Sequence, residues 1–141
     1  MKNTLVIAAF PGCGKSTFFR EKKNFVVSDS DSSTFDKSQF PTNYIHHIKR
    51  LIGEGNHDYI MVSSHDVVRE ALERHNIKYT LVYPNEECKQ EYIERYQQRG
   101  NTEGFVKLLQ GNFENWVQSC REEQFPTKIE LHPGQFLADV L

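Results

Sequence analysis

The sequence predicts an α/β fold in which parallel strands alternate with helices. Short apolar runs alternate with longer stretches whose apolar residues recur at helical spacing, a rhythm typical of βαβ units. A glycine-rich turn follows the first apolar run directly. The length of 141 residues predicts a single domain, residues 1–141. The composition, with 38% apolar and 26% charged residues, excludes disordered, coiled-coil and membrane proteins.

The strands are predicted from apolar runs that polar or turn-forming residues bound. Leu5 to Ala9 is a continuous apolar run, as expected of a parallel strand that is covered on both faces. Further runs predict the remaining strands, at residues 25–27, 59–62, 79–83 and 129–131.

The helices are predicted from helical spacing and from residues that begin or end helices. The first covers residues 15–21, and the second begins near Pro41 and ends at Gly53 and Gly55. Asn85 is suited to cap a later helix. Apolar residues at helical intervals predict the others, at residues 67–72, 92–96 and 105–117, with a closing turn at 135–141.

The cysteines and the charge bound the setting of the protein. Cys13, Cys88 and Cys120 are widely spaced, which predicts reduced thiols in a cytoplasmic protein. The N-terminal apolar run is too short for a signal sequence or a membrane span. The net charge of -2 argues against a broad nucleic-acid surface, but leaves room for a nucleotide or a strand end.

The chemistry is carried by residues 9–17, AFPGCGKST, between the first strand and the first helix. This is a phosphate-binding loop of the Walker A type, with Ala9 where the strict pattern has glycine. Gly12 and Gly14 let successive N–H groups point at phosphate oxygens, and the following helix adds its positive end. Lys15 is placed to reach the β- and γ-phosphates, and the Ser16 hydroxyl to bind Mg²⁺. The sequence therefore predicts an ATP and Mg²⁺ site, formed by Pro11, Gly12, Cys13, Gly14, Lys15, Ser16 and Thr17.

Other features favour a small phosphotransferase over a motor or a switch. Motor ATPases and switch GTPases usually hold Mg²⁺ with an acid at the end of a buried strand, whereas strand 59–62 leads into Ser63 and Ser64. The sequence has no Asn-Lys-x-Asp or Asp-x-x-Gly motif. It is also too short for a motor core with a lid domain.

With this loop and these features, the sequence resembles the branch of P-loop kinases that contains nucleoside monophosphate kinases and polynucleotide 5′-kinases. It is most similar to small phage-encoded members of that branch. The resemblance implies a P-loop NTPase fold, with a five-stranded parallel sheet of order 2-3-1-4-5 and helices on both faces. It also implies an acceptor site between the second and third strands and a short lid with arginines. Asp31 matches the carboxylate that accepts the proton of an acceptor hydroxyl, and Arg95 and Arg99 match the lid arginines.

Two aspartates follow the second predicted strand, at the sheet edge where ligands bind in open α/β sheets. Either Asp29 or Asp31 is suited to take a proton from an attacking hydroxyl, or to hold Mg²⁺ through water. Asp31 is the first choice for the base. A polar loop that caps the next turn is the alternative for both.

Arg95 and Arg99 are four residues apart, so they share one face of a helix. Gly100 and Gly104 then bracket a short tip, the layout of a small lid. Closure of such a lid would bring guanidinium groups onto the transferring phosphoryl group. The alternative is a solvated face on which these arginines pair with nearby glutamates.

Further residues have two interpretations each. Ser63, Ser64 and His65 either contact the acceptor or begin the next helix, with Ser64 or Asp66 as its cap. A second group either stacks on a base or packs on the core: Phe35, Phe40 and Tyr44. Core positions are predicted for Phe18, Phe25, Phe105, Phe113 and Trp116.

The sequence leaves the acceptor open. The leading expectation is an ATP-dependent kinase of a nucleotide-class acceptor, similar to a nucleoside monophosphate kinase. An incoming phosphate needs cations, and the segment after Asp31 offers only Lys37, Lys49 and Arg50. A hydroxyl acceptor needs a base, which keeps a polynucleotide 5′-end as the alternative. An ATP-binding regulatory module without kinase activity is the remaining possibility.

Overall fold

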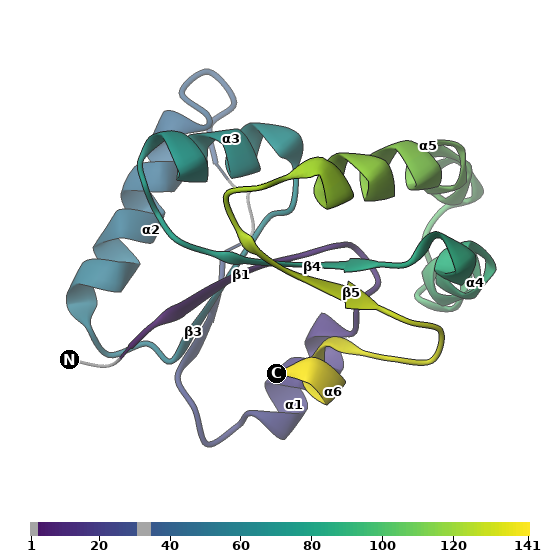
Figure 1. Cartoon of the computed structure of the whole chain (residues 1–141), viewed down its shortest axis with the longest axis horizontal. Coiled ribbons are helices and arrows are strands. Elements are labelled where there is room, and N and C mark those ends of the chain that lie inside the picture. Colours follow the sequence, from purple (N-terminus) through teal and green to yellow (C-terminus); the bar gives the residue numbers. More distant parts are fainter. Residues whose placement is uncertain (1–2, 31–34) are drawn as a thin grey trace.

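The computed structural model describes residues 3–30 and 35–141 (Figure 1). Within these ranges, strands and helices alternate along the chain as the sequence predicts. The strands are β1 (Leu5–Ala9), β2 (Val27–Asp29), β3 (Tyr59–Val62), β4 (Thr80–Pro84) and β5 (Thr127–Leu131). The helices are α1 (Lys15–Glu21), α2 (Thr42–Glu54), α3 (Asp66–Arg74), the 3₁₀ helix η2 (Glu86–Cys88), α4 (Lys89–Gln98), α5 (Glu103–Glu122) and α6 (Leu137–Val140).

The five strands form one parallel sheet in the order β2-β3-β1-β4-β5, so the predicted topology is confirmed. The central strand β1 pairs with β3 through Leu5 opposite Tyr59 and with β4 through Ile7 opposite Thr80. β2 pairs with β3 so that Asp29 lies opposite Met61. The carboxyl ends of β2, β3 and β1 therefore meet at one edge, where the loop after β1 begins.

Helices cover both faces of the sheet. Figure 1 shows α3 and α5 on one side, α1 and the C-terminal α6 on the other, and α4 beyond the end of β4. Ile7, Ala8 and Leu81 in the middle of the sheet are fully buried, because both of its faces are covered. Aromatic rings join β1 to the two helices near the loop, with the Phe10 centroid 6.2 Å from Tyr92 and 5.6 Å from Phe113.

Some boundaries differ from the prediction. The second strand begins at Val27 and ends at Asp29, because its pairing partner β3 sets its register. Phe25 therefore lies before the strand, and its side chain is 47% exposed. Phe105 is 46% exposed as well, so the expected core positions of these two residues are wrong. Trp116 is only half-buried against the core.

Two helix ends also differ. His65, rather than Ser64 or Asp66, is the N-cap of α3, and the Ser63 hydroxyl accepts a hydrogen bond from the His65 N–H. Gly104 lies inside α5, whose cap is Thr102, so only residues 99–102 connect α4 to α5. The expected lid is thus a short turn. Asn85 caps η2 as predicted, accepting from the N–H of Glu87.

The three cysteines are buried and unpaired. Burial raises the pKa of the Cys13 thiol to about 12, so this loop cysteine stays protonated and is no nucleophile at neutral pH. Among the helices of the described residues, none is long and apolar enough to cross a membrane.

Candidate active site

The loop between β1 and α1 has the backbone conformation that its glycines predict. Gly12 and Gly14 have φ angles of 91° and 92°, which side chains other than glycine rarely adopt. A Cβ atom on Gly12 would lie 2.8 Å from Cε1 of Tyr96, and one on Gly14 would lie 2.6 Å from Cδ1 of Phe136. Both positions thus need glycine for the turn and for the close approach of an aromatic ring.

The carbonyl groups of the loop are held by donors from distant parts of the chain. The Tyr96 hydroxyl donates to the carbonyl oxygen of Pro11 over 2.7 Å, and Arg95 donates to that of Gly12 over 2.6 Å. The N–H of Leu137 donates to the carbonyl oxygen of Cys13 over 2.7 Å. These contacts occupy the loop carbonyls. The first N–H groups of α1 lack partners within the helix, so the loop offers hydrogen-bond donors to an anion.

Lys15 and Ser16 lie where the Walker A pattern predicts, on the exposed side of the loop at the start of α1. The Lys15 ammonium lies 3.2 Å from a carboxylate oxygen of Asp29, at the end of β2. This ion pair is roughly half exposed, so a triphosphate can compete for the lysine. Thr17 accepts a hydrogen bond from Arg20 through its hydroxyl.

The donor set fits ATP with Mg²⁺. Backbone N–H groups and Lys15 suit phosphate oxygens, and the exposed hydroxyl of Ser16 suits a Mg²⁺ ion that the phosphates also hold. Within residues 3–30 and 35–141, no group of three or more His, Cys, Asp or Glu residues could hold a metal ion by itself.

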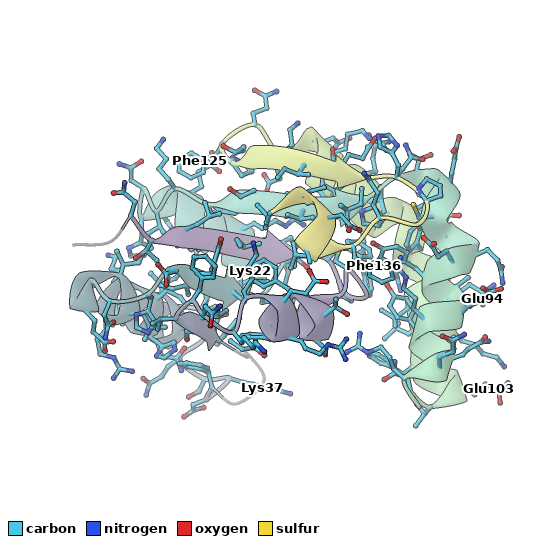
Figure 2. The ribbon with its side chains drawn as sticks, turned by 90° about the horizontal axis from the view of Figure 1, so that it is seen from below. Lys22, Lys37, Glu94, Glu103, Phe125 and Phe136 are labelled. Atoms are coloured by element: carbon cyan, nitrogen blue, oxygen red, sulfur yellow. The ribbon has the colours of Figure 1, made fainter. Side chains whose placement is uncertain are left out.

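Arg95 and Arg99 have different surroundings despite their shared helix. The Arg95 guanidinium lies between two rings, 4.5 Å from the Tyr92 centroid and 4.1 Å from that of Phe136, and it pairs with Glu91 over 3.3 Å. Phe136, labelled in Figure 2, lies at the start of the yellow C-terminal helix. The Arg99 side chain is exposed, and no partner in the described chain holds it. Of the two, Arg99 is therefore the arginine that can bind a phosphate without losing a described contact.

A pocket of about 760 Å³ extends from the loop into the space between α3 and α5. Arg95, Gln98 and Arg99 line it on the side of α4. Its far part is lined by residues from the β3–α3 junction and from α5, which are Val62, Ser63, Ser64, His65, Asp66, Trp116 and Ser119. The pocket therefore joins the phosphate loop to the carboxyl end of β3, where the sequence places an acceptor.

Arg69 closes the far end of this pocket and is 5% exposed. Its Nε donates to the carbonyl oxygen of Ser64 over 2.8 Å, and its two terminal nitrogens donate to Ser119. It also pairs with Glu123 over 3.0 Å. Arg69 thus ties α3 to α5 and sets the spacing of the two pocket walls.

Tyr44 on α2 holds the ends of β2 and β3 together. Its hydroxyl donates to the carbonyl oxygen of Ser30 and accepts from the N–H of Ser63 over 3.2 Å. Phe35 packs edge-on against Tyr44, with ring centroids 5.0 Å apart, and Phe40 packs on it as well. The packing interpretation of these aromatic residues therefore describes their contacts, and none of the three lines the pocket.

His47, one turn further along α2, makes a second contact between this helix and Ser30. Arg50 donates to Nδ1 of His47 over 3.1 Å, which leaves the hydrogen on Nε2 to donate to the Ser30 hydroxyl over 3.2 Å. Desolvation, and then the nearby charge of Arg50, lowers the pKa of His47 below its ordinary value. His47 is thus neutral at pH 7.

The structure brings some predicted residues together and gives others supporting roles that the sequence did not predict. Lys15 and Asp29 meet at the loop, whereas Asp31 lies outside the described residues. Tyr44, Arg69 and Phe136 were missed as site-supporting residues, because each acts through contacts with residues far away in the sequence. An arginine within the apolar pattern of α3 was the one local signal for Arg69.

No protein-family model and no curated protein matches the chain. Among solved structures, the chain is similar to an uncharacterised protein from Eubacterium ventriosum, with a TM-score of 0.50 and 12% identity over 97% of this chain and 92% of that chain. A gluconokinase from Sinorhizobium meliloti gives a TM-score of 0.49 and 17% identity over 97% of this chain and 86% of that chain. At these identities the likeness concerns the fold alone.

Proposed function

We propose that this chain is an ATP-dependent kinase that transfers the γ-phosphoryl group to a nucleotide-class acceptor. The observation that carries the proposal is a pocket that joins the phosphate loop to the polar residues between β3 and α3. A module that only binds ATP needs no space beyond the γ-phosphate, whereas a kinase needs an acceptor there.

The residues of the site have distinct proposed roles. Lys15 and the loop N–H groups bind the phosphates, and Ser16 binds the Mg²⁺ that ATP carries, which neutralises phosphate charge. Arg99 closes on the transferring phosphoryl group from the turn after α4. Asp31 takes the proton from an acceptor hydroxyl, and Asp29 orients Lys15 until phosphate displaces it.

The acceptor we propose is a small nucleoside compound, with or without a phosphate of its own. A 5′-hydroxyl end of a polynucleotide is the alternative, since Asp31 would serve any attacking hydroxyl. The net charge of -2 favours the small acceptor, because a bound strand would need many phosphate contacts.

An acceptor screen tests the proposal. Purified protein with γ-labelled ATP and Mg²⁺ is offered nucleosides, nucleoside monophosphates and 5′-hydroxyl oligonucleotides, with Lys15→Ala as the matched variant. We expect labelled product from at least one class, and none with Lys15→Ala. Tight ATP binding without transfer to any acceptor would overturn the kinase in favour of the ATP-binding module.

A further inference from the structure

We infer that the acceptor is a nucleoside, a compound with a free hydroxyl and a planar base but no phosphate. This inference rests on the proposed function and concerns the same pocket. Two observations carry it. Most of the cationic side chains that line the pocket already have partners, and Trp116 lies in the pocket wall.

The cationic side chains among the described pocket residues are Lys15, Arg69, Arg95 and Arg99. In the proposed function, Lys15 binds the phosphates of ATP. Arg69 is already bound: its Nε donates to Ser64, and its terminal nitrogens lie 2.8 to 3.2 Å from oxygen atoms of Ser119 and Glu123. Arg95 is held against the loop carbonyl of Gly12 and between two rings. For Arg99, by contrast, no hydrogen bond or ion pair of the side chain is found among the described residues.

One available arginine, Arg99, cannot neutralise two phosphate groups at once. In the transfer step Arg99 is needed at the phosphoryl group that moves, where charge develops. A phosphate on the acceptor would then enter the pocket without a dedicated cation, and an unpaired anion removed from water is strongly disfavoured. Breaking the contacts of Arg69 or Arg95 would leave partly buried oxygen atoms without these donors. The pocket therefore selects an acceptor without a phosphate.

The far part of the pocket suits a nucleoside in two respects. The hydroxyl groups of Ser63 and Ser64 and the imidazole of His65 offer hydrogen bonds to sugar hydroxyls. Trp116 lies across the same space on α5, half-buried and in the pocket wall. An indole ring in such a position is a surface on which any base can stack.

The reaction would then balance as a simple transfer. The nucleoside hydroxyl oxygen forms a bond to the γ-phosphorus of ATP, and the bond between that phosphorus and the β–γ bridging oxygen breaks. ADP leaves with the electron pair, and the hydroxyl proton passes to the general base that the proposed function requires. The products are a nucleoside monophosphate and ADP.

Fluorescence provides the direct test of binding, since Trp116 is the sole tryptophan in the sequence. The protein, saturated with a non-hydrolysable ATP analogue and Mg²⁺, is titrated with a nucleoside, its 5′-monophosphate and free ribose. We expect saturable quenching by the nucleoside, at least ten-fold weaker binding of the monophosphate, and no quenching by ribose. Tighter binding of the monophosphate, or the absence of quenching by any nucleoside, would overturn the inference.

Transfer kinetics separate this inference from the proposed function. We expect Trp116→Ala to raise the KM for nucleoside roughly ten-fold or more, in line with the loss of a stacked base, and Trp116→Phe to restore most of it. The KM for ATP should not change. Phe105→Ala removes an exposed ring from the same helix outside the pocket lining and should behave as the wild type. Efficient transfer to monophosphates would refute the nucleoside while the kinase stands, and transfer to no acceptor would refute both.

Discussion

Arg95 and Arg99 show that two arginines on one helix face can have different roles. Both were predicted to close on the phosphoryl group. In the structure Arg95 donates to the Gly12 carbonyl and stacks on Phe136, so it holds the shape of the loop. Arg99 is the C-cap of the same helix, and its exposed side chain has no hydrogen bond or ion pair with another described residue. Their spacing could predict a shared face, but not the contact across 83 residues that occupies one of them.

Substitution of each arginine should therefore have a different effect. Arg95→Gln should lower the free energy of unfolding by about 1–3 kcal/mol, since the partly buried carbonyl of Gly12 loses a charged donor, and it should raise the KM for ATP. Arg99→Gln should leave stability within about 0.5 kcal/mol but lower kcat by roughly a hundred-fold or more. Urea unfolding and steady-state kinetics check both. Equal kinetic effects of the two variants would contradict the division of roles.

The two aspartates after β2 give a second contrast. Asp31→Asn should abolish transfer to a hydroxyl and keep ATP binding, because the amide cannot take the proton. Asp29→Asn removes the anion beside Lys15 and should keep transfer, with at most a modest change in the KM for ATP. Transfer assays and ATP-binding measurements on the same preparations test these two roles. Near-normal transfer by Asp31→Asn would remove the base from this position.

At the scale of elements, α2 is latched to the sheet edge by Tyr44 and His47. His47 makes this latch pH-dependent because its pKa is lowered, first by desolvation and then by Arg50, against an opposing effect of Glu54. The unfolded chain takes up the proton near pH 6.5 and the folded chain only at lower pH. Stability is therefore fully present above about pH 6.5 and is lost as the pH falls through the interval between the two pKa values.

His47→Gln is the matched variant for this effect. A glutamine can accept from Arg50 and donate to Ser30, yet it does not titrate. We expect the wild type to lose stability relative to His47→Gln between pH 7 and about pH 5, as measured by urea unfolding at each pH. His75, whose pKa is also lowered, is present in both proteins and cancels. Parallel stability curves would show that the His47 proton does not weaken the latch.

The elements themselves were largely predictable, because their signals are local. The apolar run at Leu5–Ala9, the glycine turn and the cap at Asn85 each act within a few residues, and the structure has all three. The strand near Phe25 was placed too early, since register with β3 decides where β2 begins. Trp116 follows the helical spacing of a core residue, yet α3 and α5 stand far enough apart to leave a pocket beside it. Such a separation depends on Arg69 and cannot be read from α5 alone.

At the scale of the whole molecule, the end of the chain supports the loop near its beginning. Leu137 is fully buried, its N–H donates to Cys13, and Phe136 covers Gly14. The Lys22 ammonium, at the C-terminal end of α1, donates to the carbonyl oxygen of Leu141 over 2.9 Å. The sequence predicted a closing turn of helix but not its docking site, because more than a hundred residues separate the partners. Phosphate binding and the packing of the C-terminal segment thus depend on the same backbone.

This dependence predicts that one buried leucine matters for ATP and another does not. Leu137→Ala and Leu72→Ala each remove a fully buried leucine side chain, so both should cost about 2–5 kcal/mol of stability. Leu72 lies on α3, away from the phosphate loop and outside the pocket lining, so its variant should bind ATP as the wild type does once folded. Leu137→Ala should bind ATP several-fold more weakly, because the segment that donates to Cys13 and covers Gly14 loses its anchor. Calorimetric titration with ATP and Mg²⁺ at a temperature where both variants are folded measures the difference, and equal affinities would show that the loop holds its shape without the C-terminal segment.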